Sequence, residues 1–195
     1  MDATKTSILR EHAVCNLCLL KPQEPGQLEA LTTWIKNVSE QLDAQWCAPP
    51  LGYRCSRSCS KIRDQMSDNP QLASTWHTIM AHLEECQSPQ CELRTRAELR
   101  EVLHLIECKQ LEICEVRNEL KEKKDNWSMA MHYSDETRRS DDLGLHKADL
   151  ESLEAELQNL KTELTSLMAK KTSLCATMDT IQLDWRDEDC NRQGN

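Results

Sequence analysis

The chain has 195 residues, of which 38% are hydrophobic and 29% charged, with four glycines and no phenylalanine. This composition provides little material for a large globular core or for the tight turns of β-rich folds, and it is typical of elongated helical proteins. The net charge of −9 disfavours binding to phosphate backbones. We therefore predict an all-α fold, and we do not expect nucleic acid or a small-molecule substrate as a partner.

The N-terminal sequence lacks the apolar core of a secretory signal, and no stretch approaches the roughly 18 apolar residues of a membrane-spanning helix. We therefore expect an intracellular protein, cytoplasmic or associated with the cytoskeleton, with the nucleus as an alternative, and no membrane partner. In such a reducing compartment the eleven cysteines are expected to be thiols or metal ligands rather than disulfides.

The first part of the chain, residues 1–87, is predicted to be a Cys-rich helical head. Apolar residues recur at helical spacing in several short segments, which the proline-containing stretches "KPQEPG" and "APPLG" separate. Asn69 followed by Pro70 is a favourable helix start, because Asn caps the first turn and Pro fits within it. These short helices are expected to pack as a small bundle.

The second part is predicted to contain two long heptad helices, at 88–133 and 145–187. A polar linker, 134–144, lies between them, and a disordered tail, 188–195, follows. The first helix repeats apolar residues every seven positions, although Lys109 and Lys123 interrupt the seam. The second helix is more regular and at ~1.5 Å per residue would be too long for the head to cover. We therefore predict an elongated, two-segment coiled coil.

The partner of this seam is the main question that the sequence raises. An antiparallel hairpin within the chain would bring Glu112 and Glu119 near Glu156 and Glu163, whereas parallel pairing with another chain offers opposite charges. We therefore favour pairing with another coiled-coil subunit or with a second copy, and keep the hairpin as the alternative. The predicted partner-binding seam comprises Leu99, Ile106, Ile113, Leu120, Leu150, Leu153, Leu157, Leu160, Leu164, Leu167, Leu174 and Ile181.

Three short motifs carry potential metal ligands. They are His12, Cys15 and Cys18; Cys55 and Cys59; and His82, Cys86 and Cys91. Zinc is commonly held by Cys and His pairs separated by two to four residues. The last motif, H-x3-C-x4-C, resembles a single repeat of the TAZ-type zinc fingers over about ten residues, whereas those proteins contain several such repeats.

Packing explains the same cysteines without a metal. Cys15 shares an apolar helix face with Leu19, and His82 and Cys86 lie near Leu83 in the sequence pattern. A buried cysteine behaves as a small hydrophobic residue. The spacings between the candidate ligands are also inconsistent from pair to pair. We therefore expect no required metal and no cofactor.

The sequence contains none of the common phosphate-loop, dinucleotide-binding, serine-hydrolase or zinc-protease motifs, so we predict a non-enzymatic protein. The expected function is that of a coiled-coil scaffold or adaptor subunit of a larger assembly. Its layout is similar to that of rod subunits in kinetochore, cytoskeletal and vesicle-tethering complexes, an analogy of architecture alone. The alternative is a zinc-stabilised protein-binding module with a dimerising coiled-coil tail.

Overall fold

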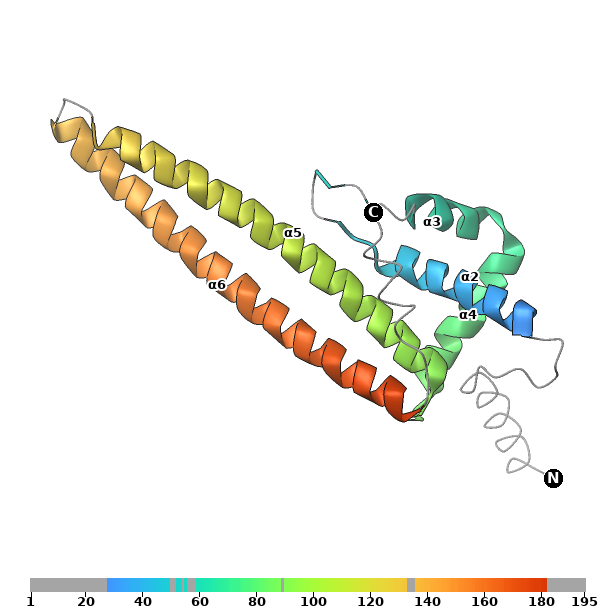
Figure 1. The fold of residues 1–195 in the computed structure, drawn as a ribbon. Coiled ribbons are helices and arrows are strands. Elements are labelled where there is room, and N and C mark those ends of the chain that lie inside the picture. The colour runs from blue at the N-terminus through green and yellow to red at the C-terminus, as the bar shows by residue number, and fades with distance from the viewer. Residues whose placement is uncertain are drawn as a thin grey trace, which may run out of the picture. The chain divides into compact units, whose positions relative to one another are not determined.

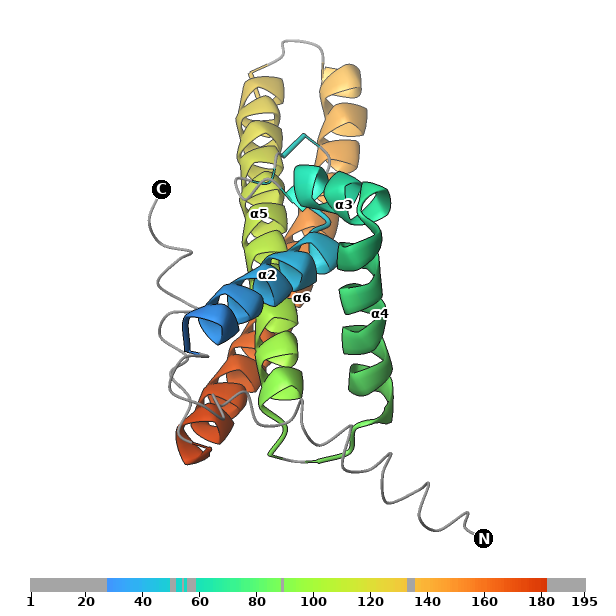
Figure 2. The same ribbon diagram turned by 90° about the vertical axis from the view of Figure 1, so that its right-hand side faces the viewer.

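The computed structural model describes residues 28–49, 52–53, 55, 59–88, 90–132 and 136–181. These residues form helices α2 (Leu28–Trp46), α3 (Cys59–Asp68), α4 (Pro70–Glu85), α5 (Glu92–Ala130) and α6 (Glu136–Thr180), and no strand occurs among them (Figures 1 and 2). The predicted all-α fold is therefore confirmed. The predicted ligands His12, Cys15 and Cys18 and the predicted tail 188–195 lie outside the described residues.

The chain divides into two compact units. Among the described residues, the first comprises those between 28 and 104 together with 170–181, and the second comprises those between 105 and 169. Both long helices contribute residues to each unit. None of the helices in the described ranges combines the length and the apolar composition that a bilayer crossing requires.

Helix α4 of the first unit begins as predicted. The Asn69 side chain accepts hydrogen bonds from the backbone N–H groups of Gln71 and Leu72, at 3.0 and 3.4 Å, and Pro70 occupies the first helical position. Asn at this place satisfies N–H groups that have no partner within the helix, and Pro there loses no helical hydrogen bond.

The core of the first unit forms where α2, α4 and the beginning of α5 meet. Its buried members are Val38, Leu42, Ile79, Cys86, Cys91, Leu93 and Ala97, with Trp46, Trp76 and Leu83 packed against them. A second cluster packs Leu99 and Leu103 of α5 against Cys175 and Met178 of α6. The first turns of α5 are thus covered by α2 and α4 and by the end of α6.

A polar contact also joins α2 to α5 in the first unit. Arg100 donates a hydrogen bond to Asp43 Oδ2 at 2.7 Å, and His104 Nε2 lies 3.0 Å from Asp43 Oδ1. The three side chains are almost fully buried. Since a buried charge is tolerated only when it is paired, Asp43 and Arg100 fix the position of α5 on α2.

The second unit is an antiparallel hairpin of α5 and α6. Ile113 and Val116 pack against Leu153 and Leu160, with Leu120, Leu157 and Leu164 beside them. Two ion pairs cross between the helices, from Lys123 to Asp149 at 2.7 Å and from Lys124 to Glu154 at 2.9 Å. Residues late in α5 thus meet residues early in α6, which defines the antiparallel direction (Figure 1).

This packing corresponds to the hairpin that the sequence left as the alternative, and pairing with another chain stays a prediction. Leu153, Leu157, Leu160 and Leu164 of α6 pack against α5 of the same chain. The expected repulsion is relieved by Lys109, whose ammonium group lies 2.7 Å from Glu112 and 2.8 Å from Glu163. The lysine that interrupts the heptad pattern therefore sits between the two glutamates that the hairpin brings together.

Replacing Lys109 with alanine is expected to lower the free energy of unfolding of the hairpin by about 0.5 kcal/mol, because the pairs are partly exposed. Hydrogen bonds to Glu112 and then to Glu163 raise the pKa of Lys109 above its ordinary 10.5. Its contribution is therefore present below pH 10.5 and lost as the pH rises through the raised pKa. Urea titrations of the wild type and Lys109→Ala at neutral and strongly alkaline pH measure this. Lys121→Ala, at an exposed lysine of the same helix, is the control, and an equal difference at both pH values would contradict the assignment.

Helix α6 begins at Glu136, within the segment 134–144 that was predicted to be a linker.

Candidate metal centres

Two groups of Cys and His side chains converge in the first unit. We refer to Cys47, Cys55 and Cys59 as cluster A, and to His82, Cys86 and Cys91 as cluster B. Within each cluster the potential ligand atoms all lie within 4.8 Å of one another. Each cluster is located where one helix ends and the next begins.

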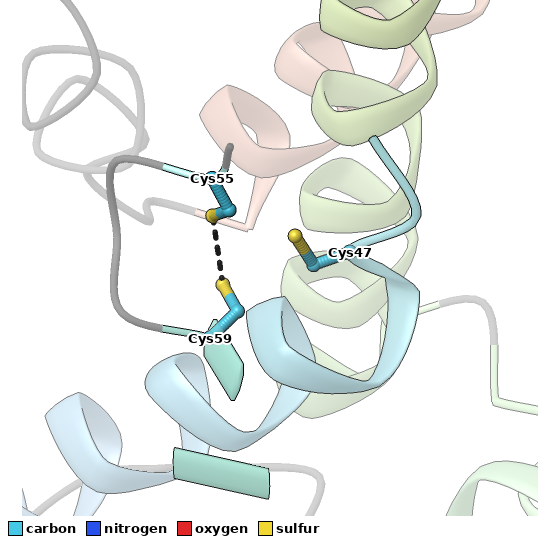
Figure 3. Close-up of side chains that lie close together, drawn as sticks. All are labelled: Cys47, Cys55 and Cys59. Carbon is cyan, nitrogen blue, oxygen red and sulfur yellow. Dashed lines mark hydrogen bonds between the residues drawn. The ribbon is translucent and has the colours of Figure 1, made fainter. Parts of the chain in front are cut away.

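Cluster A joins the end of α2 to the start of α3. Cys47 directly follows α2, Cys59 is the first residue of α3, and Cys55 lies in the connection. The three sulfur atoms point toward one another, and the Sγ atoms of Cys55 and Cys59 are 3.3 Å apart (Figure 3). Gly52 in this connection has a φ of 90°, a conformation that a residue with a Cβ rarely adopts.

Arg63 of α3 connects α3 to the end of α2 beside cluster A. Its guanidinium group donates hydrogen bonds to the carbonyl oxygens of Ala44 and Cys47, at 2.9 and 3.0 Å. Ala44 lies in the last turn of α2, where carbonyl groups have no partner within the helix, and Cys47 directly follows that turn. The position of Cys47 relative to α3 is therefore fixed by the backbone and not only by its own side chain.

Two thiols of cluster A, those of Cys47 and Cys59, have pKa values above the ordinary value for cysteine. Burial, and then the neighbouring Cys55, raise the pKa of Cys47 to about 11. Burial and hydrogen bonding with Cys55 also raise the pKa of Cys59. The site as it stands favours neutral thiols, since a second negative charge so close to the first is unfavourable. A bound cation would reverse that preference.

Cluster B joins the end of α4 to the start of α5, and its three residues are buried. His82 Nε2 lies 3.0 Å from Cys91 Sγ. Cys86 is the C-terminal cap of α4, and its N–H donates to the His82 carbonyl at 2.8 Å. The Arg94 guanidinium also donates to the carbonyl of Leu83 and so links α5 to the last turn of α4.

Cys91 acts as the N-terminal cap of α5. Its carbonyl accepts a hydrogen bond from the N–H of Thr95 at 3.0 Å, and its Sγ accepts one from the N–H of Arg94 at 3.4 Å. The sulfur therefore lies at the positive end of a long helix.

The sequence motifs identified most of these ligands but not their grouping. The pair Cys55 and Cys59 and the trio His82, Cys86 and Cys91 were recognised from their spacing. Cys47 joins cluster A because the end of α2 lies close to the start of α3. In the sequence, seven residues separate Cys47 from Cys55, and this spacing alone did not identify Cys47 as a ligand. In contrast, Cys108, Cys114 and Cys175 belong to neither cluster.

The predicted seam residues lie on one narrow stripe of each long helix. All twelve are buried or half-buried, while most residues between them on α6 are exposed. Eight of the twelve belong to the two clusters in which α5 packs against α6, namely Leu99, Ile113, Leu120, Leu153, Leu157, Leu160, Leu164 and Leu174. These eight residues take part in the hairpin contacts, and the predicted contact of the seam with a partner stays a prediction.

Comparisons of the chain with protein-family models, with curated proteins and with solved structures found no match. Function is therefore inferred from the residues and their arrangement.

Proposed function

We propose that this chain is a non-enzymatic scaffold or adaptor subunit that connects other proteins in an intracellular assembly. The architectural analogy with rod subunits of cytoskeletal, kinetochore and tethering complexes supports this class of function. A second candidate, a protein-binding module with a zinc-stabilised head, is favoured by clusters A and B. Both candidates require a surface that binds another protein.

The observation that carries the proposal is a group of exposed apolar side chains at the end of α5. Trp127, Met129 and Met131 are 38%, 60% and 49% exposed. Trp127 and Met131 are four residues apart and therefore lie on one side of the chain as the helix ends. Trp and Met are enriched in protein interfaces, where they act as large apolar anchors.

The charge of the second unit supports a protein partner over a nucleic acid. Residues 105–169 contain 15 acidic and nine basic residues. An acidic rod repels phosphate groups, whereas it attracts basic protein surfaces and increases the rate of association with them. We therefore propose a protein partner that inserts apolar side chains against Trp127 and Met131 and carries basic residues around them.

Pairing of the seam leucines with another chain would be a different mode of binding. It requires α6 to separate from α5, because the seam leucines Leu153 and Leu160 already pack against Ile113 and Val116. We propose the exposed end of α5 as the partner site and keep exchange of α6 between two chains as the competing mode.

The proposal is tested by quantitative mass spectrometry of proteins that co-purify with the chain from native cells. The double variant Trp127→Glu, Met131→Glu should reduce a stoichiometric partner about tenfold or more, because interface anchors of this kind contribute 2 kcal/mol or more. The matched control Gln110→Glu, Asn118→Glu adds the same charge at exposed positions of α5 and should retain the partner. Equal recovery with the two double variants would contradict the assigned site, and the absence of any stoichiometric partner would contradict the function.

A further inference from the structure

We propose that clusters A and B each bind a structural zinc ion, one linking α2 to α3 and the other linking α4 to α5. The inference concerns how the first unit is held together and does not depend on the proposed function. It reverses the expectation from sequence that the head requires no metal.

The spacing of the ligand atoms fits a single ion in each cluster. Zinc binds thiolate sulfur at about 2.3 Å in tetrahedral geometry, which places neighbouring ligand atoms about 3.8 Å apart. All three potential ligand atoms of each cluster lie within 4.8 Å of one another. Each set therefore already surrounds a common point, so that binding an ion requires only small movements of the side chains.

The chemical identity of the ligands also favours zinc. Cluster A supplies three sulfur atoms, and cluster B supplies two sulfur atoms and one imidazole nitrogen. Sets of thiolates and imidazoles are typical of tetrahedral zinc, whereas magnesium and calcium prefer carboxylate and carbonyl oxygens. The described residues provide three ligands at each site, which leaves one position of the tetrahedron for a further ligand.

Hydrophobic packing alone does not explain cluster B. Cys86 and Cys91 belong to the apolar core, and packing would account for their burial. It would not direct the buried His82 imidazole to within 3.0 Å of Cys91 Sγ. Nor does it require the N–H of Arg94 to point at that sulfur, a contact that metal-bound thiolates commonly receive from the surrounding backbone.

Both clusters also share a structural plan. Each contains a cysteine at the start of a helix, Cys59 in α3 and Cys91 before α5, and a cysteine just beyond the end of the preceding helix, Cys47 and Cys86. A metal bound in this way closes a loop between consecutive helices. Small units with limited cores are commonly stabilised by such ions, whose binding energy contributes directly to folding.

The test is the zinc content of the full-length protein, purified under reducing conditions with zinc supplied and then freed of loosely bound metal. We expect about two zinc ions per chain, one for each cluster. Cys59→Ser and Cys91→Ser should each reduce this to about one, and the double variant should retain none. Cys114→Ser, at an exposed thiol of α5 outside both clusters, should retain the wild-type content.

Cobalt substitution keeps the test decisive if a serine variant does not fold. Cobalt added to the metal-free wild type should give thiolate-to-metal charge-transfer absorption from both clusters. Cys59→Ser should lose the absorption of cluster A, and Cys91→Ser should lose that of cluster B. His82→Cys should retain the second ion, since a thiolate can replace the imidazole, whereas His82→Ala should lose it. The proposal would be overturned if the wild type held no zinc and showed no charge-transfer band with cobalt. If the wild type held one zinc ion per chain, the proposal would be overturned for the cluster whose variants leave that zinc content unchanged.

Discussion

Replacing Asp43 with alanine is expected to lower the free energy of unfolding of the first unit by about 3 kcal/mol. The Asp43 carboxylate receives a hydrogen bond from Arg100 at 2.7 Å and lies 3.0 Å from His104, and both contacts are buried. Without it, the Arg100 guanidinium loses the negative charge that balances it in a poorly hydrated site. Urea unfolding followed by tryptophan fluorescence measures the effect, because Trp46 and Trp76 pack against the core of this unit.

Two comparisons make this result specific to the buried pair. Asp43→Asn keeps the shape of the side chain and should be less destabilising than Asp43→Ala. Asp64→Ala removes an exposed aspartate of α3 and should change stability by no more than about 0.5 kcal/mol. If Asp43→Ala and Asp64→Ala had equal effects, Asp43 would not connect α2 to α5 in the way described.

Leu160→Asp is expected to destabilise the hairpin of the second unit by about 3 kcal/mol or more. Leu160 is buried in the cluster with Ile113 and Val116. Loss of a buried aliphatic side chain costs about 1.5–3 kcal/mol, and introducing a charge among apolar neighbours adds to this. Thermal unfolding followed by circular dichroism should show a lower transition temperature for the part of the helical signal that α5 and α6 contribute.

Ser152→Ala is the control for this change, because Ser152 is exposed on the same helix. It should leave the transition temperature unchanged. A hairpin within one chain also predicts that the midpoint of unfolding is independent of protein concentration for both the wild type and Leu160→Asp. A midpoint that rises with concentration would instead indicate that the leucines pair between chains.

The local features of the fold could be predicted from the sequence because they depend on nearby residues. The start of α4 follows from Asn69 and Pro70. The buried stripe of α6 follows from the spacing of Leu150, Leu153 and Leu160, since a helix places residues three and four apart on one face. Such patterns identify which side of a helix is covered, but they do not identify what covers it.

The charge pattern favoured pairing with another chain because Lys109 was treated as an interruption of the seam and not as a partner of the glutamates. Individual exposed ion pairs contribute only tenths of a kcal/mol, so a count of favourable and unfavourable pairs is a weak guide. In the hairpin Lys109 approaches both Glu112 and Glu163, which removes the main argument against antiparallel packing. Lys109, which interrupts the heptad pattern of α5, thus forms an ion pair with Glu163 of α6.

The convergence of the clusters could not be predicted from spacing because it depends on tertiary structure. Cys47 meets Cys55 and Cys59 only when the end of α2 and the start of α3 lie close together. Similarly, Asp43 and His104 are 61 residues apart in sequence and give no local signal of their contact. The motifs indicated which residues could act as ligands, and the fold determined which of them meet.

The central claim, that α5 and α6 pair within one chain, is tested most directly by cross-linking of mixed isotopic populations. Ordinary and ¹⁵N-labelled proteins are unfolded together, refolded together and treated with a carbodiimide, which joins lysines to carboxylates in contact. Mass spectrometry should show the Lys123–Asp149 and Lys109–Glu163 links. We predict that both peptides of each link carry the same isotope. Links that combine a light and a heavy peptide in statistical proportion would contradict the hairpin and show that the helices pair between chains.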